Sequence, residues 1–260
     1  MVVVWEYYIN LLSNAGRSTF QDPMQIFNLI ILGVGGIIGI FNLHAIFASY
    51  RETKALETLS FFLSGVFLFA ALIGLSMGRL SLTSWGLPNL ADSLSIIAFI
   101  FSGIAIVCAS IFVYQFTFPQ HLVKLVSIVG IITTFSMGIL IWAVIQGPPY
   151  CNLINLERVY SPEIILVIFC FYVPIINIAP LVFFYYASKV RDENRAVSNR
   201  SFWMGLGLIC FAIGYINEIT SVFPVVVKIP LRTFYIAFTF IIYLCFKMPD
   251  WFKRSIGWHD

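Results

Sequence analysis

The chain has 260 residues, of which 60% are hydrophobic and only 10% are charged, and its 15 basic and 12 acidic side chains give a net charge of +3. A soluble domain carries about 45–50% apolar and about 25% charged residues. The composition therefore excludes a water-soluble globular protein and predicts an integral membrane protein. The small net charge gives no indication of nucleic-acid binding.

Seven predominantly apolar stretches follow one another along the chain. A helix that crosses the bilayer needs about 20 such residues, within a range of about 17–25. Because a helix satisfies its own backbone hydrogen bonds in hydrocarbon, the sequence predicts an all-α bundle of seven transmembrane helices. The expected spans are 26–49, 60–78, 92–117, 122–146, 163–188, 202–223 and 231–248.

These spans divide the chain into three parts. Residues 1–25 are expected to form a short outer interfacial segment, residues 26–248 the seven-helix domain and residues 249–260 a short cytoplasmic tail. Lys and Arg number five on the side of the N-terminus and ten on the side of the C-terminus. Since cytoplasmic loops carry the excess of Lys and Arg, we expect a multi-pass protein of the cell membrane with its N-terminus outside and its C-terminus inside.

Glycines recur in the first span, where Gly35 and Gly39 form a small-xxx-small pair next to Gly33 and Gly36. Such residues let another helix approach closely, so we interpret this face as a packing seam. The glycines of the sixth span are expected to serve the same purpose, and they are Gly205, Gly207 and Gly214.

The fifth span contains Pro174, Asn177 and Pro180. Each internal proline removes a backbone donor and leaves a carbonyl of the preceding turn without its usual partner. The Asn177 side chain is placed to satisfy one such carbonyl. A kinked helix is therefore expected here, either as a shape device or as the lining of a cavity.

Polar and ionisable groups inside spans are costly and point to functional sites. In this chain they gather toward the predicted outer third of the bundle. Glu218 and Arg232 are expected to be partners, because helices 6 and 7 are joined by only about seven residues. We interpret the group as an outward-facing ligand pocket, with a structural ion pair as the alternative; its members are Asp92, Tyr215, Asn217, Glu218, Arg232 and Tyr235.

Motifs for metal binding and for hydrolysis are missing from the sequence. No histidine pair has metal-ligand spacing, and neither a Cys-x-x-Cys nor a Gly-x-Ser-x-Gly sequence occurs. We therefore expect no metal and no cofactor, and the sequence favours a non-enzymatic protein while leaving catalysis open.

Basic and aromatic residues mark the predicted cytoplasmic side, in loop 189–201 and in tail 249–260. Such residues at a helix exit anchor a protein at the bilayer interface. The alternative is that the loop and the tail dock a membrane or cytoplasmic protein partner.

Seven spans with an outer N-terminus are also the layout of microbial rhodopsins, which need a lysine in the middle of helix 7. Helix 7 of this chain has none before Lys247, so a retinal pigment is rejected. The short loops, the basic loop 189–201 and the exit segment Met248-Pro-Asp-Trp-Phe-Lys-Arg resemble those of prokaryotic, especially archaeal, seven-span sensor modules of histidine kinases. The resemblance implies a sensor. Because the chain ends about ten residues after helix 7, its signal is expected to pass to a separate protein.

Three functions follow from these observations. The first is a sensor or receptor-like module that uses the outer pocket. The second is a structural or accessory subunit of a larger membrane complex, which needs only helix faces and glycines. The third is a small-solute transporter, which needs polar groups on broken helices near the midplane.

Overall fold

The structure is a computed structural model that describes residues 23–83, 87–146, 151–154, 157–160, 162–219 and 225–258. The expected outer segment 1–25 lies almost wholly outside the described residues. The longer elements are α2 (Pro23–Thr53), α3 (Leu56–Thr83), α4 (Pro88–Thr117), α5 (Leu122–Gln146), α7 (Val173–Val190), α8 (Arg195–Ile219) and α9 (Val225–Lys247). The shorter ones are η1 (Pro119–His121), β1 (Cys151–Ile154), β2 (Glu157–Tyr160), α6 (Pro162–Val167), η2 (Ile168–Tyr172) and α10 (Asp250–Ile256).

The prediction of seven spans is confirmed. Within the described ranges, seven helical stretches are long and apolar enough to cross a membrane. Most helices extend a few residues beyond the predicted spans, as α2 does from Pro23 to Thr53. Hydropathy marks only the part of a helix that lies in hydrocarbon, whereas backbone hydrogen bonding continues into the interface.

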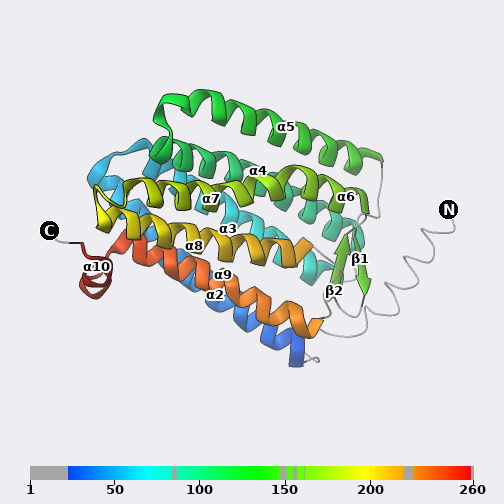
Figure 1. Cartoon of the computed structure of the whole chain (residues 1–260). Helices are drawn as coiled ribbons and strands as arrows, with labels where there is room; N and C mark the ends of the chain where they lie inside the picture. The colour runs from blue at the N-terminus through cyan, green and yellow to red at the C-terminus, as the bar shows by residue number, and fades with distance from the viewer. Residues whose placement is uncertain are drawn as a thin grey trace.

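Six of these spans form a closed ring, and the seventh packs outside it. Contacts run from α2 to α3, α4, α7, α8 and α9 in turn, and α9 closes the ring on α2. The helix α5 contacts α4 and η2 and lies along one edge of the bundle, while α10 lies at the end away from the β1–β2 hairpin (Figure 1). The helix α4 is the most enclosed span, because 56% of the residues in its apolar stretch are buried, compared with 17% in α2 and 22% in α5.

Burial follows the pattern of a bundle surrounded by lipid. Large apolar side chains are exposed on its outside, and Val123 and Ile131 are each more than two-thirds exposed. Hydroxyl side chains lie inside, and several donate to their own helix one turn back, as Ser95 does to the Ala91 carbonyl at 2.6 Å and Ser136 to the Ile132 carbonyl at 2.8 Å. These internal bonds satisfy a buried hydroxyl without a partner helix.

The fifth span is divided by a π-helical turn. The turn η2, Ile168–Tyr172, separates α6 from α7 and ends two residues before Pro174. The Asn177 side chain donates to the Val173 carbonyl at 2.8 Å. The two prolines instead remove the usual donors for the carbonyls of residues 170 and 176, so Asn177 satisfies a carbonyl one turn back but neither of those two.

Glycines are used differently in α2 and α8. A Cβ added at Gly205 or Gly214 would lie 2.8 Å from the Phe184 ring or 3.1 Å from the Tyr235 ring, so these α8 glycines do allow close packing, as predicted. On α2, a Cβ at Gly35 would meet its nearest atom only at 3.7 Å, and one at Gly33 would meet nothing within 4 Å. The packing seam predicted on α2 is looser than that on α8, because Gly35 faces Ile236 of α9, and Gly36 and Gly39 face the Phe69 ring of α3, only at ordinary contact distances of 3.7 to 4.0 Å.

A short antiparallel hairpin is an addition to the helical prediction. It pairs Cys151 with Tyr160 and Ile154 with Glu157, in the connection between α5 and α6. A two-stranded hairpin is marginal on its own in water. It does not alter the helical character of the bundle.

Candidate functional site

A cavity of about 70 Å³ lies inside the helix ring, between α3, α4, α7, α8 and α9. We call it the central cavity. Its wall is mainly aliphatic and aromatic, and five hydroxyl side chains interrupt that wall. These are Ser64, Ser102, Ser110, Tyr114 and Tyr215.

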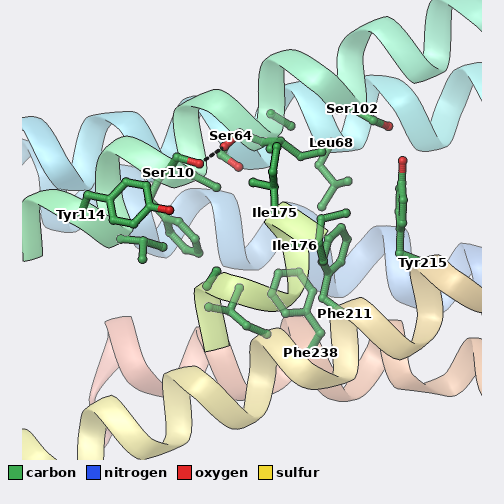
Figure 2. A pocket seen from close by; sticks show the side chains of 17 residues that line it. Ser64, Leu68, Ser102, Ser110, Tyr114, Ile175, Ile176, Phe211, Tyr215 and Phe238 are labelled. Atoms are coloured by element: carbon green, nitrogen blue, oxygen red, sulfur yellow. Dashed lines mark hydrogen bonds between the residues drawn. The ribbon is translucent and has the colours of Figure 1, made fainter. Parts of the chain in front are cut away.

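The hydroxyls come from opposite sides of the central cavity. Figure 2 shows Ser64 and Ser110 facing one another, Tyr114 on the same wall farther along α4, and the Tyr215 hydroxyl directed toward the side of Ser102. Ser102 and Tyr114 are twelve residues apart in α4, or about 18 Å along the helix axis. The central cavity is therefore long and narrow.

The α4 serines are already hydrogen-bonded within their helix. Ser102 donates to the Ala98 carbonyl at 3.0 Å, and Ser110 donates to the Ile106 carbonyl at 2.8 Å. A hydroxyl that donates its proton can still accept a hydrogen bond through its oxygen. These serines therefore present acceptors to the cavity at little cost to the fold.

Two more cavities lie between α2, α3 and α9. The larger, which we call the peripheral cavity, has a volume of about 330 Å³ and is lined by Gly33, Ser76, Arg232 and Tyr235 among others. The smaller, the linking cavity, has a volume of about 70 Å³, and Asn42 and Gly39 are part of its wall.

The three cavities adjoin one another. Leu68 of α3 and Phe238 of α9 line all three, Ser64 is shared by the central and linking cavities, and Gly35 is shared by the linking and peripheral cavities. The three cavities are thus neighbours that lie between the α2 side of the bundle and its centre.

An aromatic cluster stands between the central and peripheral cavities. The Phe211 ring contacts the rings of Tyr215, Tyr235 and Phe238, with centroid distances of 5.8, 6.0 and 5.1 Å. Gly214 leaves room for the Tyr235 ring. Two predicted site residues, Tyr215 and Tyr235, therefore both contact the Phe211 ring, although they line different cavities.

The remaining predicted site residues that the structure describes are deeply buried. Arg232 lines the peripheral cavity, whereas Asp92 and Asn217 do not line any of the three cavities. All three are more than nine-tenths buried, and each makes an interaction with its surroundings. Glu218 lies in α8, which packs on α9 as expected, but its side chain lies outside the described part, so its pairing with Arg232 stays a prediction.

Side chains that the sequence analysis did not select form much of the cavity walls. Ser95, Ser102 and Ser110 recur every seven or eight residues in α4, a spacing that places them on one helix face. That recurrence was the available signal for the central cavity. Asn42 is a second omission, and its Oδ1 atom is buried without a hydrogen-bond partner.

The opposite end of α8 holds the C-terminal segment in place. The Arg200 Nε donates to the Cys245 carbonyl at 3.0 Å, and its guanidinium lies 5.9 Å from the centre of the Trp258 ring. The Asn199 side chain donates to the Ile256 carbonyl at 3.0 Å. Residues 250–258 are thus folded back onto the start of α8.

A contact to α7 completes this end of the bundle. The Ser198 hydroxyl donates to the Ala187 carbonyl at 2.7 Å. Exposed charged residues 191–193 and 195 lie beside it, and Trp251 of α10 is 55% exposed. Loop 189–201 and the described part of tail 249–260 therefore form one continuous surface, which we call the α10 end.

Within the described ranges, no group of three or more His, Cys, Asp or Glu side chains is arranged to hold a metal ion. The sequence was also compared with models of protein families and with curated proteins, and it matches none of them.

Proposed function

We propose that the chain is a non-enzymatic, receptor-like membrane module that binds a ligand inside the helix ring and passes a change of conformation to a separate protein. The observation that carries this proposal is the set of adjoining cavities within the ring, which share Leu68 and Phe238. Ligand sites are typically concave and mostly apolar with a few converging polar groups. The central cavity has this character.

The α10 end supports an output on the opposite side from the β1–β2 hairpin. It gathers exposed charged and aromatic groups from loop 189–201 and α10, and Arg200 connects α8 to α9 and to Trp258. We place this end in the cytoplasm and the protein in the plasma membrane, on the count of Lys and Arg. A C-terminal epitope tag should then be detected only after cells are permeabilised.

The ligand part of the proposal is tested by native mass spectrometry of the protein purified in mild detergent. We expect a chain without stoichiometric partner chains that retains a small molecule. Leu68→Trp, which places an indole where the three cavities adjoin, should lose that molecule. Leu63→Trp is the matched control, because Leu63 of the same helix is 38% exposed on the outside of the bundle, and it should retain it.

Two results would contradict the proposal. Partner chains that co-purify at fixed stoichiometry would favour an accessory subunit of a larger complex. Equal small-molecule content in Leu68→Trp and Leu63→Trp would show that the cavities are not the binding site.

A further inference from the structure

The glycines of α2 pack only loosely against the neighbouring helices. A Cβ at Gly33 would meet no atom within 4 Å, and one at Gly36 or Gly39 would meet only the Phe69 ring, at 3.8 and 4.0 Å. By contrast, a Cβ at Gly74 of α3 would lie 3.3 Å from the Leu94 carbonyl oxygen of α4. The bundle is thus closely packed at α3–α4 and open at α2, where the linking and peripheral cavities lie.

The side-chain oxygen of Asn42, in the wall of the linking cavity, lacks a hydrogen-bond partner. Asn42 is only 7% exposed, lines the linking cavity, and its Oδ1 atom has no hydrogen-bond partner. Several buried serines of this bundle avoid that cost by bonding to their own helix, as Ser110 does. A buried acceptor left unsatisfied opposes folding, so an occupant that donates a hydrogen bond to Asn42 is strongly favoured there.

The surroundings of Asn42 define the chemistry of that occupant. The linking cavity is otherwise lined by glycines, Leu, Ile and Phe side chains, together with Ser64 and Thr239. None of the described residues that line it is ionisable, so a charged group would be left without compensation in an apolar wall. Arg232 borders the peripheral cavity, but it already has an interaction of its own.

The position of the peripheral cavity indicates how an occupant reaches Asn42. Its wall includes Gly33 of α2 and Ile73 of α3, and both are exposed on the outside of the bundle, where apolar side chains face lipid. Gly35, which lines both cavities, and Asn42 are seven residues apart, so they lie on the same face of α2 and about 10 Å apart along its axis. An extended chain can lie along this distance and reach Asn42 from the membrane.

We propose that the peripheral and linking cavities bind an uncharged, elongated lipophilic molecule that bears a hydroxyl or amide N–H, which it donates to the Asn42 Oδ1. The molecule enters from the bilayer between α2 and α3. This inference rests on the proposed receptor function and names the chemical class of its ligand.

The test uses the full chain in phosphatidylcholine nanodiscs and a photoactivatable 1-dodecanol as the probe. Labelled peptides should come from α2, α3 and α9. Unlabelled 1-dodecanol should compete, whereas dodecyl methyl ether, which has no donor, and dodecanoate, which is charged, should compete at least about threefold less well, the loss that one hydrogen bond corresponds to.

Two substitutions locate the site. Asn42→Leu keeps the branched shape and the number of heavy atoms of the side chain but removes the amide, and it should lower the affinity for 1-dodecanol about three- to tenfold without lowering the unfolding temperature of the free protein. Gly39→Leu fills the linking cavity and should abolish specific labelling. Its control is Gly138→Leu, at an α5 glycine where a Cβ would meet nothing within 4 Å, and it should label as the wild type does.

Three results would overturn the inference. They are an ether that competes as well as the alcohol, wild-type affinity in Asn42→Leu, and labelling confined to other helices. Water alone at Asn42 would produce the second result. If this test fails but Leu68→Trp still loses a retained molecule, the ligand class is rejected and the receptor proposal stands. If labelling requires Asn42 but the chain purifies with stoichiometric partners, the receptor proposal is rejected and the binding site stands.

Discussion

Gly103 of α4 is the described glycine at which an added Cβ would lie closest to neighbouring side chains. A Cβ added there would lie 2.7 Å from the Tyr172 Oη, 2.9 Å from the Thr133 Cγ2 and closer still to the Met137 Cε. The methionine end is flexible and can move, but Tyr172 is fully buried and its hydroxyl donates to the Phe99 carbonyl at 3.3 Å. Gly103→Ala must therefore displace η2 from α4 or break that hydrogen bond.

The size of the effect follows from three opposing contributions. Overpacking a close-fitting interior costs about 1–3 kcal/mol, and loss of the tyrosine hydrogen bond adds about 0.5–1.5 kcal/mol. Alanine gains about 1 kcal/mol over glycine in helix propensity. We expect Gly103→Ala to lower the free energy of unfolding by about 1–3 kcal/mol on these contributions.

Unfolding can be followed with the protein's own thiols. Cys210 and Cys245 are buried and free, so they should react with a fluorogenic maleimide only as the bundle opens in a titration with sodium dodecyl sulfate. Gly138→Ala is the control and should be neutral or slightly stabilising. The double variant with Tyr172→Phe should be less destabilised than the sum of its parts, because the Oη contact is gone. Wild-type stability in Gly103→Ala, or strict additivity in the double variant, would refute the reasoning.

Three further predictions concern other contacts. Arg200→Leu removes the hydrogen bond and the ring contact that hold residues 250–258, so trypsin should cleave after Arg254 faster than in the wild type, whereas the exposed Arg195→Leu should leave that rate unchanged. Ser198→Ala removes the bond to the α7 carbonyl and should lower the free energy of unfolding by about 0.5–1.5 kcal/mol. Gly214→Val should push away the neighbouring tyrosine ring of α9 and cost about 1–3 kcal/mol in the same titration; an unchanged midpoint would contradict the packing described here.

The number and approximate place of the spans could be predicted because they depend on local composition alone. The π-helical turn at Ile168–Tyr172 could not, although Pro174 and Pro180 stood out in the sequence. The turn consists of apolar residues with no local signal. Tyr172, at its end, is fully buried and reaches the Phe99 carbonyl of α4, so tertiary contact contributes to its place.

The packing around the glycines could not be predicted from the sequence either. Spacing in the sequence tells which glycines share a helix face, but not what lies opposite that face. On α8 a ring packs against Gly214, and on α2 the space next to Gly33 is empty. Gly103, where a Cβ would come closest to neighbouring side chains of α5 and η2, has no small residue four positions away, whereas Gly74 does form a small-xxx-small pair with Gly78.

The candidate site was predictable only where the residue type was unusual for a span. Arg232 and Tyr235 stood out as polar groups in apolar surroundings, and both line the peripheral cavity. Ser64 and Ser110 did not, because serine is small and satisfies itself within its own helix. Their shared role depends on α3 and α4 packing side by side around the central cavity, which a single sequence does not specify.

In the receptor proposed here, α8 is the element that can link the cavities to the α10 end. It runs from Arg195 to Ile219 without an internal proline, and Tyr215 at the central cavity is fifteen residues, or about 22 Å, from Arg200 at the other end. The neighbouring α7 follows a π-helical turn and contains Pro180, so it can deform locally where α8 moves as a rod. We propose that a ligand in the central cavity, which Phe211 lines, shifts α8 against α7, and that the contacts of Arg200 with α9 and with the C-terminal segment change as a result.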